Sequence, residues 1–293
     1  MKKMFVLLLA GVICIISACA KCQNEIKVYY SNSGGFSVSL DLKGIEEEDN
    51  VRNWPDPEAE RNRQIDFMGS VINGDYTSTL QSNWYKTKDE YIKKENEKNM
   101  YFAVDRESSK VLTYSNNYNR YYVWPDNYSK AILTENDCLD IAVNYLKQFT
   151  ELYSEYSLAS VKMEDYHLPN WPISYEYIFE LNTAVHCDDI YITIRSDGEL
   201  TLISHQKEID NLTYETAKLV NLKKLYGASD KAIKTKLGDQ YDRYNIERSE
   251  SLPDLAMPYY GGLFVRVAYL ISNEKTDLYP NQLIVYVPIE MCI

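Results

Sequence analysis

Residues 190–203 read IYITIRSDGELTLI, and this stretch sets the local fold in the middle of the chain. Apolar and β-branched residues dominate Ile190–Ile194 and Leu200–Ile203, and each run has the length of a strand. Between them lies Asp197-Gly198, a pair that supplies the positive φ needed in a tight turn. The stretch therefore predicts an antiparallel hairpin, and Tyr101–Tyr114 predicts a second, weaker one around a polar turn.

Each predicted hairpin is followed by a pattern typical of a helix. Thr134 is the expected N-cap of the first helix, whose apolar stripe comprises Leu139, Ala142, Val143 and Leu146. Ser229-Asp230 is the expected cap of the second helix, whose shared face comprises Ala232, Ile233 and Leu237. Pro57 at a first helical position predicts an earlier helix over Glu58–Ile72.

Candidate antiparallel strands follow both of the later helices, so the repeating unit reads as a helix and then a meander. An amphipathic helix buries its stripe across one face of such a sheet, which is the α+β class. We therefore expect tandem α+β units, each a helix packed on an antiparallel meander sheet. The expected boundaries are 57–130 for a poorly defined first unit, 131–208 for the second and 209–293 for the third.

The N-terminus has the pattern of an export signal. Met1–Met4 is basic, and Phe5–Ile16 is an apolar run too short to span a membrane as a helix. The run ends in Ile16-Ser17-Ala18-Cys19, which looks like a lipobox; an ordinary secretory signal with an incidental cysteine is the alternative. We expect residues 1–18 to be removed, Cys19 to be acylated and residues 19–56 to form a polar tether. The protein is then expected to be a lipoprotein anchored on the extracytoplasmic side of the cell membrane.

The composition limits the classes of partner. The 293 residues are 45% hydrophobic and carry a formal net charge of −12. An acidic surface repels phosphate backbones and anionic headgroups, so nucleic acid is an unlikely partner and membrane contact is expected through the lipid. The chain has 27 tyrosines against 7 phenylalanines, which favours half-buried sheet faces.

Several of these segments together resemble the YcdB/YcdC and PepSY-like repeats of cell-envelope proteins in Gram-positive bacteria. The resemblance spans roughly residues 95–290, and its carriers are Tyr101–Tyr114, Leu133–Asp137 with Ile141-Ala142, Tyr175–Tyr177, Ile190–Ile194 with Ser196–Glu199, and Asp230–Ile233. It implies cystatin-like α+β units in tandem, no catalytic residues, and restraint of extracellular peptidases. The sequence departs from the family pattern at its last strand, which ends at Ile293 without the usual turn and return strand, so the completeness of the last unit stays open.

Residues able to carry chemistry are few. The three histidines, His167, His186 and His205, lie in no HExxH motif and near no GxSxG serine. His186-Cys187-Asp188-Asp189 is the most site-like tetrapeptide, but its place before a predicted strand favours a solvated loop over a metal site. Pairing stays open among Cys22, Cys138, Cys187 and Cys292. We expect no enzyme activity, no metal and no cofactor.

Two modes of binding stay open. The favoured one is a protein-binding or peptidase-restraining module, working through an exposed strand edge and directed at an envelope protein or peptidase. The alternative is a module that binds cell-wall glycans on exposed aromatic rings. Its candidate residues are Tyr118, Tyr121, Tyr122 and Trp124, which could instead pack between sheet units.

Overall fold

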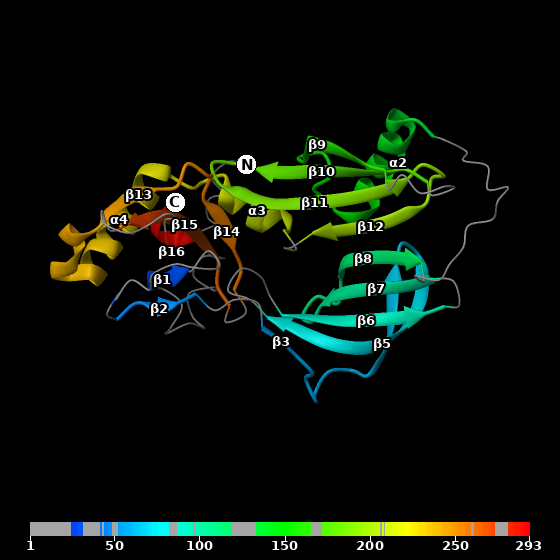
Figure 1. Ribbon diagram of the computed structural model, residues 1–293, viewed down its shortest axis with the longest axis horizontal. Helices are drawn as coiled ribbons and strands as arrows, with labels where there is room; N and C mark the ends of the chain where they lie inside the picture. The colour runs from blue at the N-terminus through cyan, green and yellow to red at the C-terminus, as the bar shows by residue number, and fades with distance from the viewer. Residues whose placement is uncertain are drawn as a thin grey trace, which may run out of the picture.

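The computed structural model joins all the described strands in one large β-sheet (Figure 1). It describes residues 25–31, 42, 44–48, 52–81, 87–95, 98–118, 133–165, 172–205, 207, 209–258, 261–272 and 281–293. Over these residues the chain forms sixteen strands in one mixed sheet and three α-helices. The predicted α+β class, with tandem units of a helix on a meander, is therefore wrong, and the fold is mostly β. Hydrogen-bonded ladders cross both predicted unit boundaries.

The first part of the sheet is an antiparallel meander. Its strands are β3 (Arg52–Trp54), β4 (Asn62–Phe67), β5 (Ser70–Gln81), β6 (Lys88–Lys94), β7 (Lys98–Asp105) and β8 (Val111–Tyr118). The helix expected over residues 58–72 is absent because Met68 and Gly69 take φ of 51° and 77°, as a two-residue hairpin loop requires. Ile65 is buried between more exposed neighbours, as in a strand whose side chains alternate between two faces. This alternation, and not Pro57 as a helix signal, determines the local structure.

The second part belongs to the same sheet. It comprises α2 (Glu135–Phe149), β9 (Ser157–Glu164), β10 (Ser174–Asn182), β11 (His186–Arg195) and β12 (Leu200–His205). The Asp-Gly hairpin is confirmed, with Gly198 at φ 91° between β11 and β12. The N-cap Thr134 is confirmed too, and Thr134 and Asp137 form a capping box. Strand β12 then pairs with β8, which joins the two parts.

The third part brings the two ends of the described chain together. It contains α3 (Asn211–Ala217), α4 (Leu222–Leu237), β13 (Asn245–Arg248), β14 (Asp254–Ala256), β15 (Phe264–Ser272) and β16 (Asn281–Pro288), with short 3₁₀ turns η2 (Gly238–Arg243) and η3 (Ile289–Met291). Strand β1 (Lys27–Ser31) pairs with β16 and with β2 (Glu46–Glu47). Both short strands, and β3, fall inside the segment expected to be a tether.

Helix α4 begins earlier than the sequence indicates. Its N-cap is Asn221, whose side chain accepts from the backbone N–H groups of Lys223 and Lys224. The expected cap, Ser229, is buried inside the helix and donates its hydroxyl to the carbonyl of Leu225. A serine that bonds back to residue i−4 satisfies its own hydroxyl, so it does not have to end the helix.

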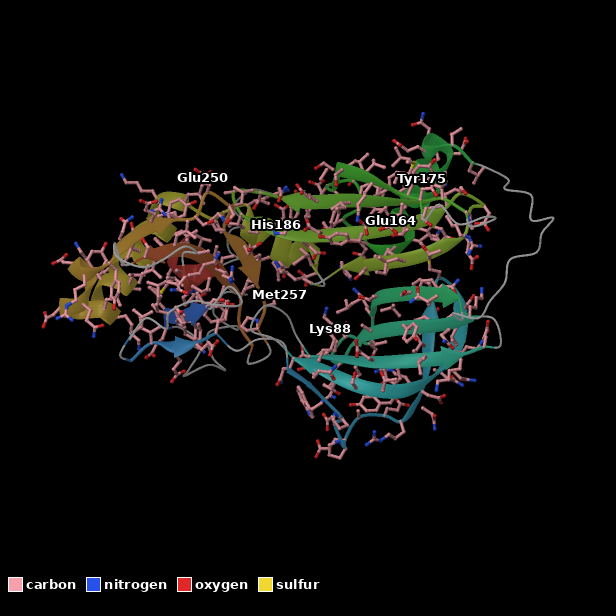
Figure 2. All side chains as sticks on the ribbon, in the orientation of Figure 1. Lys88, Glu164, Tyr175, His186, Glu250 and Met257 are labelled. Carbon is pink, nitrogen blue, oxygen red and sulfur yellow. The ribbon has the colours of Figure 1, made fainter. Side chains whose placement is uncertain are left out.

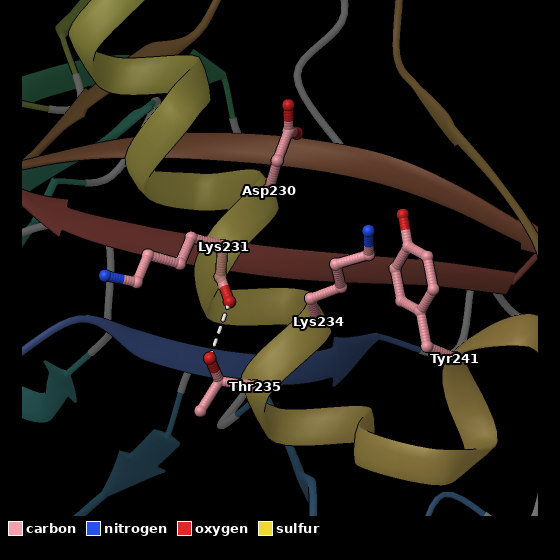
Figure 3. Close-up of a pocket in the computed structure, with 5 residues that line it drawn as sticks. All are labelled: Asp230, Lys231, Lys234, Thr235 and Tyr241. Carbon is pink, nitrogen blue, oxygen red and sulfur yellow. Dashed lines mark hydrogen bonds between the residues drawn. The ribbon is translucent and has the colours of Figure 1, made fainter.

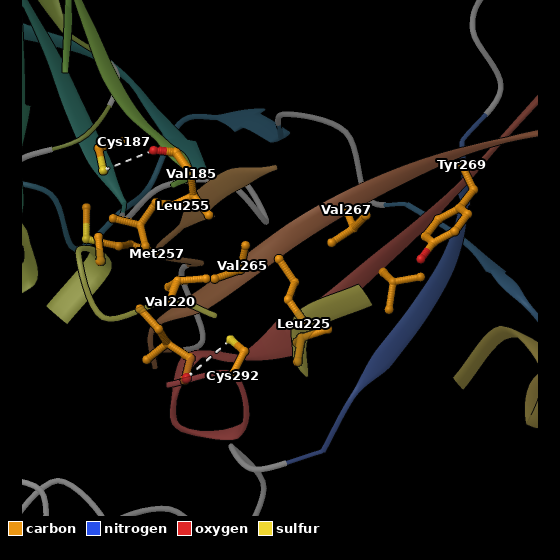
Figure 4. Packing of buried hydrophobic residues seen from close by; sticks show 14 of the residues in the cluster. Val185, Cys187, Val220, Leu225, Leu255, Met257, Val265, Val267, Tyr269 and Cys292 are labelled. Carbon is orange, nitrogen blue, oxygen red and sulfur yellow. Dashed lines mark hydrogen bonds between the residues drawn. The ribbon is translucent and has the colours of Figure 1, made fainter. Parts of the chain in front are cut away.

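Two large apolar clusters hold the sheet to its helices. In one, α2 places Cys138, Ala142 and Leu146 against strands of the middle part. In the other, α4 packs on β15 and β16, with Tyr214 and Ala217 of α3 in the same cluster, and Figure 4 shows Leu225, Val265, Val267 and Cys292 packed there. Cys138, Cys187 and Cys292 are buried free thiols, and burial raises the pKa of each to about 11. No helix in the described part of the chain is long and apolar enough to cross a bilayer.

Candidate functional site: the edge strand β9

Strand β9 lies at a margin of the sheet, outside β10 (Figure 1). Its eight residues pair with β10 from Ser157 opposite Glu180 to Glu164 opposite Ser174. Among the described residues no strand pairs with its other side. Six of the eight residues are exposed and two are half-buried. An edge of this kind presents backbone donors and acceptors that an incoming strand can use.

The face of β9 that lies on the α2 side is apolar. Leu158, Val161 and Met163 stand opposite Phe179, Tyr177 and Tyr175 of β10, three rings of the cluster beneath α2. Val161 packs against that cluster, whereas Leu158 is 41% exposed and Met163 is 58% exposed. The edge therefore offers two exposed apolar side chains, Leu158 and Met163, on the same face. Val161, which is packed against the cluster, lies between them.

The opposite face of β9 is polar. Ser157, Ser160, Lys162 and Glu164 point to this side. The ammonium of Lys162 lies 3.4 Å from a carboxylate oxygen of Glu164 and 3.9 Å from one of Glu176. Glu180 adds a further carboxylate on the same face of β10. The surplus of carboxylates over ammonium groups favours basic side chains on an incoming strand.

Strand β9 contains a local irregularity in its pairing with β10. The register between β9 and β10 shifts at Phe179, which leaves Ala159 as an extra residue in β9. Figure 2 shows Glu164 and Tyr175, which mark the end of the strand pair beyond this irregularity. Bulges and lysines on an edge strand protect sheets from indiscriminate pairing, and β9 has one of each. Its edge is thus suited to selective rather than general strand addition.

The tetrapeptide 186–189 is structural and not the solvated loop that the sequence favours. It opens β11, and the side chains of Cys187 and Asp188 are buried. Nε2 of His186 lies 2.8 Å from Asp189 Oδ1, and Nδ1 lies 2.7 Å from Asp254 Oδ1. These hydrogen bonds raise the pKa of His186 to about 9, so both ring nitrogens are protonated at neutral pH. A doubly protonated ring can serve neither as a metal ligand nor as a general base.

Asp188 is the centre of a second, enclosed network. Its carboxylate accepts from the Tyr156 hydroxyl and the Lys207 backbone N–H, and contacts His205 Nδ1, all at 3.2 Å. Burial lowers the pKa of Lys88 to about 8, although the negative charge of Asp188 acts in the opposite direction. Asp188 and Lys88 are both buried, so the network lies beneath the surface and holds β6, β11 and β12 together.

A shallow hollow of about 620 Å³ lies between α4 and η2, lined by Asp230, Lys231, Lys234, Thr235 and Tyr241 (Figure 3). It contains no histidine, cysteine or pair of carboxylates. Within the part of the chain that the structure describes, no group of histidine, cysteine, aspartate or glutamate side chains could hold a metal ion. The lining of the hollow has two ammonium groups and one carboxylate and is therefore basic.

The residues named from the sequence for lipidation and for glycan binding are not tested by the fold. Cys19, Tyr121, Tyr122 and Trp124 lie outside the described residues. Only the backbone of Tyr118 is described, where it ends β8 opposite Lys98. The expected anchor and the glycan-binding alternative therefore remain predictions.

Comparisons with known proteins add little. No protein-family model matches the chain, and no curated protein matches it. The chain is similar to the Bacillus megaterium YpeB C-terminal domain, with 13% identity over 85% of this chain and 87% of that one. The TM-score is 0.29, too low to assign a fold or a function. The resemblance to YcdB/YcdC and PepSY-like repeats therefore remains a prediction.

Proposed function

We propose that this chain is a non-enzymatic lipoprotein of the cell envelope that binds an extended segment of another protein along β9. A peptidase held in this way would be restrained from acting. One observation carries the proposal: β9 is paired on one side only among the described strands and exposes Leu158 and Met163 there. The two histidine clusters support a non-catalytic role, because His186 is held by two carboxylates and His205 is buried.

The chemistry of β9 specifies the partner. A strand added to this edge would place alternate side chains on the two faces. On one face, apolar residues of the partner would contact Leu158 and Met163. On the other face, its basic residues would contact the carboxylates of Glu164, Glu176 and Glu180. Each backbone hydrogen bond contributes about 1 kcal/mol, and each exposed apolar side chain a similar amount once covered. The expected partner is an extended segment in which apolar and basic residues alternate, bound with a dissociation constant on the order of micromolar.

The test uses synthetic peptides rather than an unidentified partner. A fluorescent peptide of about ten residues that alternates Val and Lys is titrated with the protein, and its anisotropy gives Kd. A peptide of the same composition in two blocks, VVVVV and KKKKK, is the control for charge alone. A third peptide with N-methyl groups on alternate residues keeps the side chains and loses backbone donors. We expect binding of the alternating peptide only. Equal binding of all three would refute strand addition.

Two pairs of substitutions locate the site on the chain. Leu158→Lys with Met163→Lys removes the apolar row and adds repulsion toward a basic peptide. Leu212→Lys with Leu252→Lys changes two residues of similar exposure, 48% and 51%, in α3 and in the segment before β14. We expect at least a tenfold rise in Kd for the first pair and less than a twofold change for the second. Equal loss in both pairs, or in neither, would place the binding elsewhere.

A further inference from the structure

Helix α4 is basic although the chain as a whole is acidic. It carries Lys223, Lys224, Lys231, Lys234 and Lys236, with Asp230 as its single acidic residue. That acid is engaged, because Asp230 accepts from the Tyr269 hydroxyl at 2.6 Å and lies 3.3 Å from the Arg248 guanidinium. A net charge of −12 over the chain therefore conceals a local excess of positive charge on this helix.

The lysines of α4 lie opposite its buried face. Leu225, Ser229, Ile233 and Leu237 face the core. At 100° per residue, Lys223, Lys224, Lys231 and Lys234 fall within about a 100° arc on the other side. All four are exposed, and Gly227 leaves the middle of this arc without a side chain. The four residues, which we call the lysine face, cover about three turns of the helix.

The lysine face is not neutralised within the described part of the chain. The side chains of Lys223 and Lys231 make no hydrogen bond or ion pair with a described residue. Lys234 lies 5.1 Å from the ring centre of Tyr241, and Figure 3 shows the two side by side at the hollow. Lys224 donates to the carbonyl of Ile293. No carboxylate side chain of a described residue binds these four ammonium groups, and Lys223 and Lys231 have no described partner, so the face keeps positive charge that an external anion can meet.

The fold places the lysine face near the expected lipid anchor. Helix α4 packs on β15, β16 and β1, and β1 is the first described strand. Cys19 precedes Lys27 by eight residues, which span at most about 28 Å when extended. A bilayer that holds an acyl chain on Cys19 is therefore within reach of the element that carries the lysines. The acyl groups hold only the N-terminus, whereas lysines near an anionic bilayer surface add about 1 kcal/mol each and orient the body.

We propose that the lysine face of α4 binds the anionic headgroups of the phospholipid bilayer to which the chain is anchored, and so fixes the orientation of the body. This inference rests on the proposed lipid anchor at Cys19, because the anchor is what places the chain at a membrane. The acidic remainder of the chain does not prevent the contact, because screening at physiological ionic strength limits repulsion to about 8 Å. Figure 1 shows α4 at one end of the long axis and α2 toward the other, so this orientation directs β9 away from the bilayer.

The test measures binding without the lipid. The chain from residue 19 with Cys19→Ser carries no acyl group, and all the described contacts lie within 25–293. It is mixed with vesicles of phosphatidylcholine alone or with 30% phosphatidylglycerol, and the bound fraction is measured by flotation. We expect binding to the anionic vesicles only, with loss in 0.5 M salt. Absence of binding to anionic vesicles overturns the proposal, whatever the state of Cys19 or the peptide affinity of β9.

Matched variants assign the binding to α4. Lys223, Lys224, Lys231 and Lys234 are all changed to Gln in one variant, and Lys93, Lys94, Lys110 and Lys147 are changed in a control with the same change in charge. We expect at least a tenfold fall in the partition coefficient for the first variant and less than twofold for the control. Equal falls would show a general charge effect and overturn the proposal. Thermal unfolding midpoints confirm that both variants fold.

A competition experiment distinguishes binding to a membrane surface from binding at a discrete site for free phosphate. Inorganic phosphate and sodium chloride are added at equal ionic strength to the protein on anionic vesicles. Equal displacement supports binding to the headgroup surface, because screening alone then releases the protein. Much stronger displacement by phosphate would show a discrete phosphate site in the hollow beside Tyr241 and would overturn the proposal.

Discussion

Replacing His186 tests how the two halves of the sheet are joined. Strand β11 meets β14 through one parallel pair, His186 opposite Asp254, and the His186 backbone N–H donates to the Pro253 carbonyl at 2.8 Å. The imidazole lies between Asp189 and Asp254 at this point, and Figure 2 shows His186 and Met257 at the junction. His186→Gln keeps a polar side chain and removes the charge. We expect it to weaken the junction in a way that depends on pH.

The magnitude follows from the pKa of His186. Its pKa rises from 6.5 to about 9 in the folded protein, first because of the hydrogen bond with Asp189 and then that with Asp254. A shift of about 2.5 units at 1.36 kcal/mol each corresponds to an upper bound of about 3 kcal/mol. Because the folded pKa is the higher one, this stabilisation is fully present below pH 6.5. It is lost as the pH rises through 9.

Urea denaturation of the protein and of His186→Gln at pH 6.5, 7.5, 8.5 and 9.5 measures this effect. The difference in free energy of unfolding between the two should shrink by about 2–3 kcal/mol from the first pH to the last. Asp189→Asn removes one charge and keeps an acceptor, so the fall should begin at a lower pH. A difference that stays constant across this range would refute a charged His186 as the junction.

Three further outcomes are expected. Cys138, Cys187 and Cys292 should react with a thiol reagent at pH 8 only after unfolding, because burial raises the pKa of each thiol to about 11; rapid reaction of the native protein would contradict their placement. Gly198→Ala should lower the free energy of unfolding by about 1 kcal/mol, since a φ of 91° disfavours a side chain, and a neutral effect in denaturant titration would argue against the tight turn. Mass spectrometry of the chain from cell membranes should find acylated Cys19 as the first residue, whereas an intact Met1 would remove the anchor.

Local structure in the middle of the chain was predictable because neighbouring residues determine it. Asp197-Gly198 enforces a turn whatever surrounds it, and Thr134 with Asp137 satisfies helix N–H groups from three residues away. The helix expected over 58–72 was wrong because another local signal, the loop at Met68-Gly69, decided the structure there. Met68-Gly69 is a hairpin loop without the usual Asn-Gly or Asp-Gly pair, and Pro57 was the stronger local signal.

The class of fold was not predictable because it depends on pairings between distant residues. Strand β1 pairs with β16, with Lys27 opposite Tyr286, and no local period indicates such a neighbour. In the same way β12 could have ended its own unit, but Leu202 pairs with Ser115 of β8. The first pairing brings a strand of the expected tether into the sheet of the last unit, and the second merges two expected units. Helix-and-meander patterns along a chain therefore do not distinguish separate units from one continuous sheet.

The candidate site shows the same division. The residues around Leu158 predict a strand. Whether that strand lies at an edge depends on which strands pair with β10, and nearby residues carry no information about those pairings. The basic helix was overlooked for another reason. Net charge averages over the chain, whereas an anion meets only the face within a Debye length, and α4 has to be drawn as a helix before its lysines share a side.

The two proposed surfaces belong to different parts of one sheet, so the junction between them matters for function. Helix α4 rests on the cluster around β15 and β16, whereas β9 borders the cluster beneath α2. The link between them includes the His186 and Asp254 pair, and Arg266 extends it by lying 3.9 Å from Asp254 and 3.3 Å from Glu48. A bilayer contact made by α4 can orient β9 only if this link is stiff. Ion pairs of buried or half-buried groups with fixed geometry provide stiffness that a single backbone pairing does not, which gives the charged junction a role beyond its contribution to stability.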